Sequence, residues 1–374
     1  MRRLFALAVL CIPILVTGRL PDFSRADHAG VFDGFGLLAA DVAELAHTEI
    51  TAHPQAAVEP GQNLLWCGTF QLAWNEICQR VGEDLRFAGS PPEVVELLNR
   101  REFTAADLDA ASYVAVADFV RSGVHRRIQS ELDQKFGRHA APRHLPDPAR
   151  MSRPQDIVAY TYLFKHLEFA TPFERLDAPL VFGTSAVSSF GIGEHYKPQH
   201  EALLAQVLIC DFRHEDDFVI ELSTRVPDDR LILAKVPPAA TLAQTVEKVR
   251  RRADSAPTAA LSGDVLQVPR LNFDLTRHFH ELEGRRLLTR NPQVADDLEV
   301  LTATQNIRFQ LDERGVRLRS ESQISFGCSG SRAPPTEHRM VFDRPFLIML
   351  ARREAQAPYF ALWVSNADLF VPAN

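Results

Sequence analysis

The sequence is poor in cysteine, in glycine and in net positive charge, and each shortage excludes a class of protein. Only 5 of the 374 residues are cysteines, too few for a fold built on disulfides. There are 18 glycines and no repeat or low-complexity tract, which excludes collagen-like structure and disorder. With 41 basic and 48 acidic residues the formal net charge is −7, so the overall field repels polyanions and predicts no nucleic-acid partner.

What the chain does contain is the composition of an ordinary globular protein. It is 46% hydrophobic and 24% charged, and its length suffices for one large core or two smaller ones. The 24 prolines and 24 phenylalanines predict many short elements joined by stiff turns around an aromatic core.

The start of the chain predicts export. Residues 1–18, MRRLFALAVLCIPILVTG, place Arg2 and Arg3 before an apolar stretch and end on small residues, as a cleaved signal peptide does. The short apolar stretch and Pro13 disfavour a buried helix or a membrane anchor. We therefore expect a secreted or periplasmic protein with no membrane span in the mature chain.

Helical patterns crowd the first half of the chain and strand patterns the second, which predicts an α+β fold with large mixed or antiparallel sheets. We expect a helical segment over 19–60, with a helix over 31–50, and one further domain over 61–374. That domain begins with a strand that runs into a buried helix carrying both Cys67 and Cys78. The other expected elements are a strand over 112–120, a connector over 137–156, a long strand over 156–169, a hairpin over 202–224, a helix over 241–253, and strands over 229–237, 264–276, 306–326, 339–354 and 357–366.

The carboxyl end resembles the serpin family. VFDRPFLIML (341–350) and APYFALWVSNADLF (357–370) are similar to the last two core strands of that family, and NIRFQLDERGV (306–316) is similar to the strand and hinge before its reactive loop. Weaker matches cover 112–137, 156–173 and the Pro-containing strand and following helix at 268–287. The resemblance implies a serpin-like single domain in which a protease cuts an exposed loop and the loop then inserts into a sheet as a new strand.

Two departures from the family pattern accompany these matches. Cys67, Gly68 and Phe70 stand where the family carries Ser-Pro and a second Ser, which implies that a hydroxyl network under the central sheet is lost. The connector over 137–156 occupies the place of a helix that lies across this sheet, so we expect that helix to be missing.

Charged and uncharged positions alternate strictly along the segment that follows Gly315. By the resemblance, we expect the hinge residues to be Glu313, Gly315, Val316, Leu318, Ser320 and Ser322. From Val316 to Phe326 every charge falls on one face and the other face is uncharged, so insertion as a strand would bury no charge. Leu318 and the arginines beside it are bulkier than the small residues of an inhibitory hinge. The segment is therefore compatible with rapid insertion after cleavage or with a strand that already lies in the sheet.

The bond to be cut lies in GCSGSRAPP. Spacing from Gly315 points to Ser329 and Gly330, whereas spacing back from the prolines points to Ser331 and Arg332, with Ala333 next. Arg332 suits a trypsin-like protease, which requires a basic side chain, and the alternative is that it is an ordinary solvated loop residue.

Other chemistry is disfavoured. His278 and His280, beside Glu281, are two residues apart, which places the imidazoles on different faces of the expected helix, so they predict no metal site. FGIGEH (190–195) is interpreted as a turn, and GCSGS lacks the spacing of a nucleophile elbow. We expect no catalytic residues, no enzyme activity and no cofactor. The prediction is a monomeric suicide inhibitor of a serine or cysteine endopeptidase, and the alternative is a non-inhibitory binding or structural protein of the same fold.

Overall fold

Strands outnumber helices in the computed structural model, which describes residues 36–137, 153–194, 200–318 and 338–373. Within these ranges the α-helices are α1 (Thr69–Val81), α2 (Glu93–Asn99), α3 (Val124–Phe136), α4 (His200–Leu204) and α5 (Leu242–Ala253). Single 3-10 turns occur at Val42–Glu44, Ala105–Asp107 and Val120–Ser122.

The described strands form three larger sheets and two strand pairs. The five-stranded sheet has the order β1 (Leu38–Asp41), β15 (Leu271–His278), β17 (Thr304–Asp312), β18 (Gly315–Leu318), β7 (Lys165–Glu168). The eight-stranded sheet has the order β13 (Thr258–Ala259), β10 (Val207–His214), β11 (Asp217–Leu222), β12 (Asp229–Lys235), β20 (Phe346–Arg352), β21 (Phe360–Val364), β3 (Asn63–Cys67), β2 (Thr48–Thr51). The four-stranded sheet has the order β19 (Arg339–Val341), β14 (Val265–Pro269), β9 (Ser185–Ile192), β8 (Glu174–Phe182), and the pairs are β16 (Leu287–Leu288) with β4 (Arg86–Phe87) and β5 (Tyr113–Phe119) with β6 (Ile157–Leu163).

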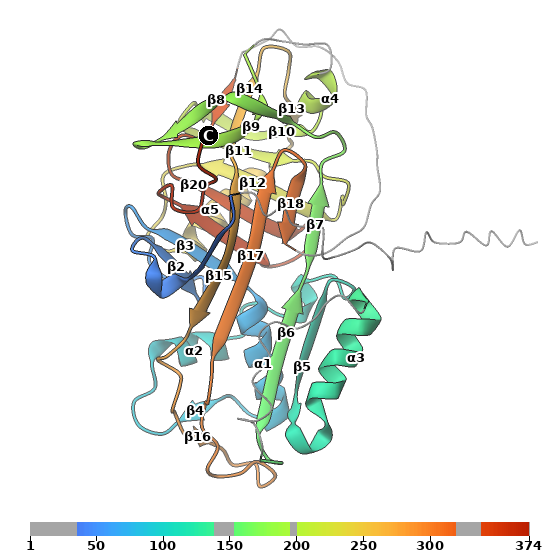
Figure 1. Ribbon diagram of the computed structural model, residues 1–374, viewed down its shortest axis with the longest axis vertical. Helices are drawn as coiled ribbons and strands as arrows, with labels where there is room; N and C mark the ends of the chain where they lie inside the picture. Colours follow the sequence, from blue (N-terminus) through green and yellow to red (C-terminus); the bar gives the residue numbers. More distant parts are fainter. Residues whose placement is uncertain (1–35, 138–152, 195–199, 319–337, 374) are drawn as a thin grey trace, which may run out of the picture.

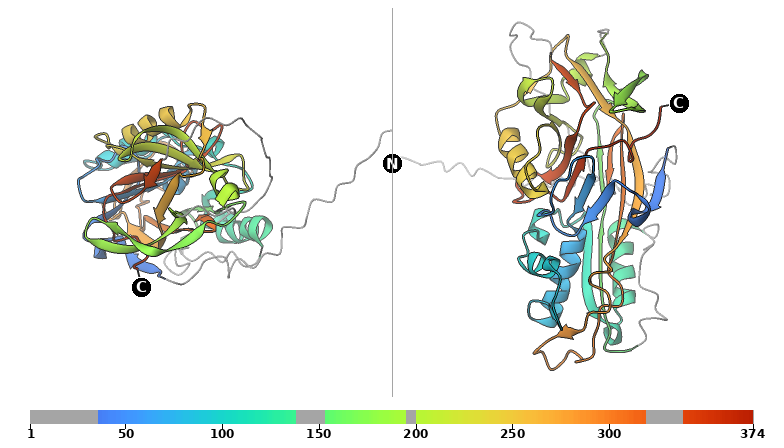
Figure 2. Two further views of the ribbon diagram at one scale, coloured as in Figure 1. Left: turned by 90° about the horizontal axis from the view of Figure 1, so that it is seen from above. Right: turned by 90° about the vertical axis from the view of Figure 1, so that its left-hand side faces the viewer.

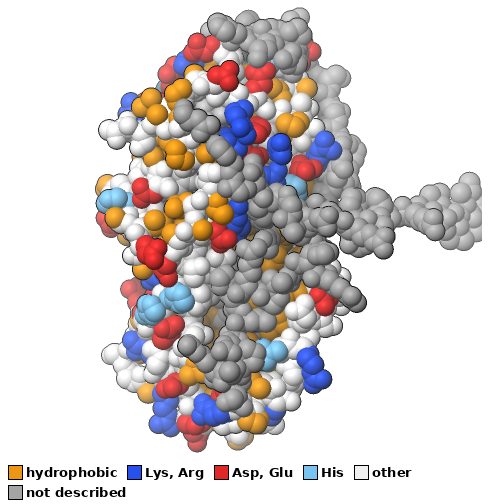
Figure 3. All heavy atoms as spheres, in the orientation of Figure 1, with side chains coloured by type: hydrophobic (Ala, Val, Ile, Leu, Met, Phe, Trp, Pro, Cys, Tyr) orange, Lys and Arg blue, Asp and Glu red, His pale blue; other side chains and the backbone are white. Residues whose placement is uncertain are grey.

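The long strands connect the two ends of the molecule. Figure 1 shows β15 and β17 running from the eight- and four-stranded sheets toward the end that holds α1, α2 and β5, with β6 and β7 along nearly one line beside them. The right-hand view of Figure 2 places α1 and α5 on one side of these strands. Figure 3 shows acidic and basic side chains interspersed over the face seen in Figure 1.

An aromatic core joins the five-stranded sheet to the eight-stranded sheet. Phe309 of β17 stacks on Phe360 of β21, with ring centroids 4.8 Å apart, and on Phe273 of β15 at 5.4 Å. All three side chains are completely buried. Burial of rings of this size supplies much of the hydrophobic free energy of folding, so β17 is fixed firmly against the sheet behind it.

The predicted α+β class, with large mixed and antiparallel sheets, is confirmed. The hairpin expected over 202–224 is β10 with β11, and the last two predicted strands are β20 and β21, which pair antiparallel at the centre of their sheet. The helix expected over 241–253 is α5, and the Thr241 side chain accepts a hydrogen bond from the backbone of Gln244 at its start, as an N-cap does.

The helix expected over 31–50 is wrong for its described part. Residues 38–51 form β1, a 3-10 turn and β2. β1 pairs in parallel with β15 and β2 pairs in parallel with β3. Apolar residues at spacings of three and four fit a helix locally, but pairing with distant strands determines the outcome here.

Three local expectations also need correction. The helix expected after the strand at 268–276 is absent from residues 279–287, which form turns up to β16, and His278 and His280 stack with ring centroids 5.6 Å apart instead of lying on separate helix faces. Phe190–Ile192, expected in a turn, belongs to β9. Cys67 ends β3, so it does not share a helix with Cys78.

Candidate functional site

The hinge segment predicted from the sequence lies inside the five-stranded sheet. β18 is antiparallel to β17 on one side, with Val316 opposite Leu311, and antiparallel to β7 on the other, with Leu318 opposite Lys165. Val316 is fully buried and Leu318 is 5% exposed. This four-residue strand therefore fills the space between two neighbours that it joins into one sheet (Figure 1).

Gly315 explains how β18 can begin so close to β7. Its φ is +142°, and a Cβ added there would lie 2.2 Å from the carbonyl oxygen of Leu167. A separation of this size is a severe overlap with backbone, and L-residues with a side chain rarely adopt such a φ. Glycine is thus the residue that allows the chain to turn from β17 into β18.

The turn between β17 and β18 is fixed by two arginines and two backbone bonds. Glu313 lies 3.1 Å from the Arg175 guanidinium and 3.3 Å from that of Arg270, whose side chain is 3% exposed. The backbone N–H groups of Phe173 and Phe169 donate to the carbonyl oxygens of Glu313 and Arg314. The start of the hinge is therefore held to residues 169–175 on one side and to Arg270 on the other.

The expectation that insertion buries no charge is wrong at Arg317. This side chain points to the opposite face from Val316, yet it is only 8% exposed, and its guanidinium lies 3.0 Å from the carboxylate of Asp312. Gln310 donates to the same carboxylate at 2.8 Å. A buried charge is tolerated when it is paired and hydrogen-bonded, so Asp312 accounts for the presence of Arg317 in the sheet.

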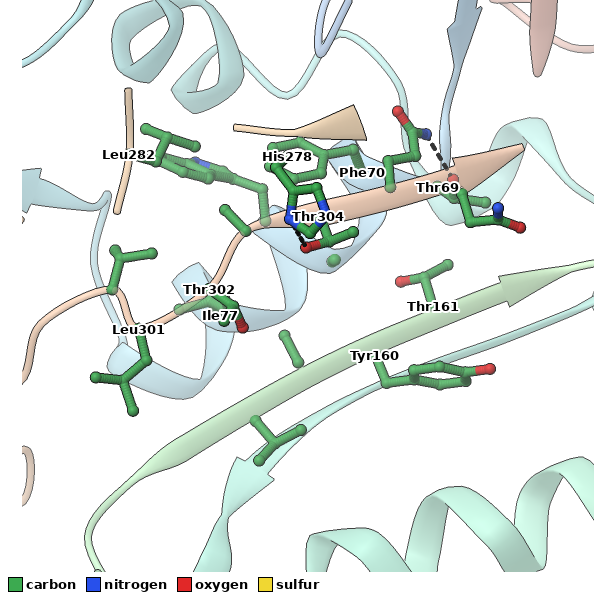
Figure 4. A pocket seen from close by; sticks show the side chains of 18 of the residues that line it. Thr69, Phe70, Ile77, Tyr160, Thr161, His278, Leu282, Leu301, Thr302 and Thr304 are labelled. Carbon is green, nitrogen blue, oxygen red and sulfur yellow. Dashed lines mark hydrogen bonds between the residues drawn. The ribbon is translucent and has the colours of Figure 1, made fainter. Parts of the chain in front are cut away.

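Below β18, strands β17 and β6 border a cleft of about 1270 Å³, which we call the slot. Its walls are β6 and the Thr304–Arg308 part of β17, its floor includes α1, and Leu318 lies at its upper end. Among the described strands, β6 pairs only with β5. Figure 4 shows Thr161 projecting from β6 toward β17 and shows Phe70 and Ile77 of α1 beneath. The slot thus continues the path of β18 along the sheet.

A polar cluster lies under the middle of the slot. The Gln305 side chain of β17 donates to the carbonyl oxygen of Cys67 at 3.0 Å and to the Thr69 hydroxyl at 2.8 Å. The expected loss of a hydroxyl network is therefore wrong in part, because Thr69, between the substituted residues Gly68 and Phe70, supplies a hydroxyl. Gly68 is needed there, since a Cβ would lie 2.2 Å from the Phe103 ring.

A buried ion pair lies at the boundary between β18 and the slot. Lys165, opposite Leu318, is 2.7 Å from the Asp229 carboxylate, and both side chains are 4% exposed. Burial raises the pKa of Asp229 despite the opposing effect of Lys165, and burial raises the pKa of Tyr359 beside them well above its usual value. This pair links β7 to β12 and so joins the two large sheets.

The remaining predicted residues are placed as follows. Ser320, Ser322 and the candidate scissile stretch Ser329, Gly330, Ser331, Arg332 and Ala333 lie outside the described residues, as do the signal segment 1–18, Cys328 and most of the connector over 137–156. Cys67, Cys78 and Cys210 are buried free thiols. None of the described helices has the length and apolar character to cross a membrane. Within the described ranges, no group of His, Cys, Asp or Glu side chains is arranged to hold a metal ion.

Sequence reasoning did not identify Gln305, Thr161 or Asp229. A signal existed for Gln305, because it continues the alternation of Ile307, Phe309 and Leu311 onto the buried face as a polar residue. A polar residue at a core position of a strand calls for a partner. Asp229 and Thr161 carry no comparable signal, since their roles depend on contacts with distant strands.

Comparisons with known proteins give likenesses of structure only. No family model and no curated protein matches the chain. The structure is similar to Serpin48 of the insect Tenebrio molitor, described as a highly specific serpin, with 12% identity, a TM-score of 0.46, and coverage of 83% of this chain and 92% of that one. It is similar to serine protease inhibitor (serpin)-12 of Manduca sexta, with 12% identity, a TM-score of 0.46, and coverage of 81% and 92%. It is also similar to a thyroxine-binding globulin complex with thyroxine, with 12% identity, a TM-score of 0.40, and coverage of 81% and 92%.

Proposed function

We propose that the protein is an exported, monomeric serpin-like inhibitor of a serine or cysteine endopeptidase that acts by strand insertion. The observation that carries this proposal is the position of β18. The first residues of the predicted hinge already lie between β17 and β7, and the slot begins directly below Leu318. A chain that is cut beyond the hinge would have a continuous path along which to extend β18.

The proposed mechanism follows from this geometry. The nucleophile of the protease attacks a carbonyl within 329–333, the peptide bond breaks, and the new amino terminus leaves with the downstream chain. The upstream residues, still acylated to the protease, then extend β18 between β17 and β6. New backbone hydrogen bonds and buried apolar area drive this step, and inhibition requires that it outpace hydrolysis of the acyl-enzyme.

A second function is favoured by a different observation. Three of the predicted hinge residues, Gly315, Val316 and Leu318, already lie in the sheet of the uncut chain together with the buried Arg317. Such a structure also suits a non-inhibitory binding protein whose resting state includes a partly inserted loop. In that case the Asp312–Arg317 pair would hold the hinge in place rather than prepare it for extension.

Melting temperatures before and after cutting the loop test the proposal. The chain is cut within 329–333 with a trypsin-like or elastase-like protease, and the cut is located by intact mass. Strand insertion predicts a gain of tens of degrees in melting temperature. Gly315→Val, whose side chain would overlap Leu167, should abolish most of the gain, whereas Gly183→Ala, a turn glycine with φ +62° and open space around it, should keep it.

Inhibition itself is tested on the same protein. Incubation with a panel of serine and cysteine endopeptidases should yield an adduct that survives SDS with at least one of them. A large thermal gain with no adduct across the panel would favour the non-inhibitory alternative. No thermal gain would overturn the proposal of strand insertion.

A further inference from the structure

A second, smaller cavity lies between α5 and β3 and shares no lining residue with the slot. Its volume is about 150 Å³, and an apolar cavity of about this volume is large enough to hold benzene. Trp66 of β3 and Phe103 line it, and their rings meet edge to face with centroids 5.5 Å apart. Both residues are 2% exposed. The cavity therefore offers buried aromatic surface to a single ring.

Two buried polar atoms of the lining residues have no hydrogen-bond partner within the described chain. They are Nε1 of Trp66 and Nδ1 of His53. The indole nitrogen can only donate a hydrogen bond. Burial lowers the pKa of His53, so the imidazole is uncharged at neutral pH and one of its two nitrogens can accept. The cavity thus presents one buried donor and one buried ring nitrogen that can accept.

Bonds between segments that are distant in sequence hold the walls of the cavity in place. The backbone N–H of Ala243, near the start of α5, donates to the carbonyl oxygen of Pro54 at 2.6 Å. The Arg250 side chain, later in α5, donates to the carbonyl oxygen of Gln356. All four residues line the cavity. It is therefore formed before any ligand enters, as binding pockets for small molecules usually are.

The charged side chains at the cavity disfavour an anion. Glu102 and Glu247 line it together with Arg250. The Arg250 guanidinium already bonds to backbone carbonyl oxygens and lies 3.9 Å from the Glu247 carboxylate. An anionic ligand would meet two carboxylates and a guanidinium that is already partnered, so like-charge repulsion favours a neutral ligand.

We propose that this cavity binds a small, neutral aromatic carboxamide. The amide oxygen accepts from Nε1 of Trp66, the amide NH₂ donates to Nδ1 of His53, and the ring lies beside Phe103. A carboxamide matches the two buried atoms because it carries an acceptor and a donor on one planar group. Occupancy of this site does not depend on strand insertion, so the two proposals stand or fall separately.

Titration of the uncut protein with benzamide tests the proposal. The chain has three tryptophans, and their indole N–H signals can be followed by NMR and assigned with Trp→Phe variants. Benzamide should shift the Trp66 signal with a dissociation constant on the order of 1 mM or tighter. The Trp74 signal should not move, because its Nε1 donates to Asn99 at 2.9 Å outside the cavity. An unmoved Trp66 signal at the solubility limit of benzamide would overturn the proposal.

Two ligands of similar shape separate the polar contacts from the apolar ones. Benzoate has the outline of benzamide with a negative charge, and it should bind at least about tenfold more weakly. Toluene has no polar atom and should bind about two- to tenfold more weakly than benzamide. Equal affinities for the three compounds would show that neither buried polar atom is used and would contradict the assignment.

Matched variants locate the site. Ala243→Leu, on α5, adds volume inside the cavity and should abolish benzamide binding, whereas Ala73→Leu makes the same change at the lining of the slot and should leave it unchanged. Trp66→Phe keeps a ring but lacks the N–H, so it should weaken benzamide binding about two- to tenfold and toluene binding by less than about twofold. Ligand-observed NMR measures these affinities, and the melting temperature of each variant checks that it folds.

Two outcomes would refute the location of the site in folded variants. Binding that survives Ala243→Leu, or that is lost in Ala73→Leu, would place benzamide elsewhere than in this cavity. A Trp66→Phe variant that binds benzamide as tightly as the wild type would show that the indole N–H is not the donor.

Discussion

Two regions of the molecule are bordered by β17 on one side and by the line of β7 and β6 on the other, and they differ in what lies between these strands. We call them the upper half, beside β7, and the lower half, beside β6. In the upper half, β18 bridges β17 and β7, and the side chains that meet there, such as Leu311 and Val316, are fully buried. In the lower half, β17 and β6 border the slot, and polar atoms of Gln305 and Thr161 lack partners within the described chain. Under the proposed function, the lower half is where the added strand would lie.

The largest expected effect is a difference in the free energy of unfolding between alanine substitutions in the two halves. Leu311→Ala, in the filled half, is expected to reduce the free energy of unfolding by about 3–5 kcal/mol, because it leaves a cavity in a closed core. Ile77→Ala, on the floor of the slot, should cost about 1 kcal/mol, since its side chain already borders a cleft. Urea unfolding of the uncut protein measures both values, and equal losses would contradict the comparison.

The second-largest effect on stability is expected from breaking the Lys165–Asp229 ion pair, which lies at the boundary between the halves. Asp229→Ala should cost about 3 kcal/mol, because it leaves the buried Lys165 with neither a counter-charge nor a hydrogen-bond acceptor. Lys165→Met combined with Asp229→Leu should restore most of the loss, since replacing both partners by apolar groups is often neutral. A double variant as unstable as the single one would show that the ion pair itself stabilises the fold, and that the loss in the single variant does not come only from leaving Lys165 unpaired.

The same pair predicts a dependence on pH. Burial holds the pKa of Asp229 above its ordinary value of 3.8, so between that value and the raised one the folded state keeps a proton that the unfolded state has released. In this window the contribution of Asp229 to stability falls as pH rises. Below pH 3.8 both the folded and the unfolded state hold the proton, so the contribution no longer changes with pH. The wild type minus the double variant, measured by urea unfolding from pH 3 upward, should show this slope.

The smallest expected effect concerns the hinge turn. Glu313→Gln should cost about 1–2 kcal/mol, mainly because Arg270, which is 3% exposed, loses its carboxylate partner. Glu247→Gln on α5, which breaks an exposed pair with Arg251, is the control and should change stability by less than about 0.5 kcal/mol. A loss at Glu313 no larger than the control would mean that the turn is held by its backbone bonds alone.

Elements whose pattern matches their environment could be predicted from the sequence. The β10–β11 hairpin, β20 and β21 are nearly continuous apolar runs between turns, and α5 has both a capping threonine and basic residues in its last turn. Residues 38–51 could not be predicted, because their strands exist only through pairing with β15 and β3. Local spacing contains no information about such distant partners.

The site was predictable in outline but not in its polar details. The turn at Glu313 and the alternation after Gly315 predicted a strand that follows this turn, and β18 lies there. The burial of Arg317 depends on Asp312 and Gln310 in the adjacent strand, and the bonds of Gln305 depend on the junction of β3 and α1. These contacts arise from the fold and leave no mark in the spacing of the residues themselves.

The central placement of β20 and β21 has a consequence for any cut within 329–333. The downstream piece would carry β19, β20 and β21, and the last two are fully hydrogen-bonded on both edges and almost wholly buried. This fragment could not leave without dismantling the middle of the largest sheet. A cut molecule should therefore elute as a single undivided particle in size-exclusion chromatography, and only a denaturing gel should reveal two polypeptides.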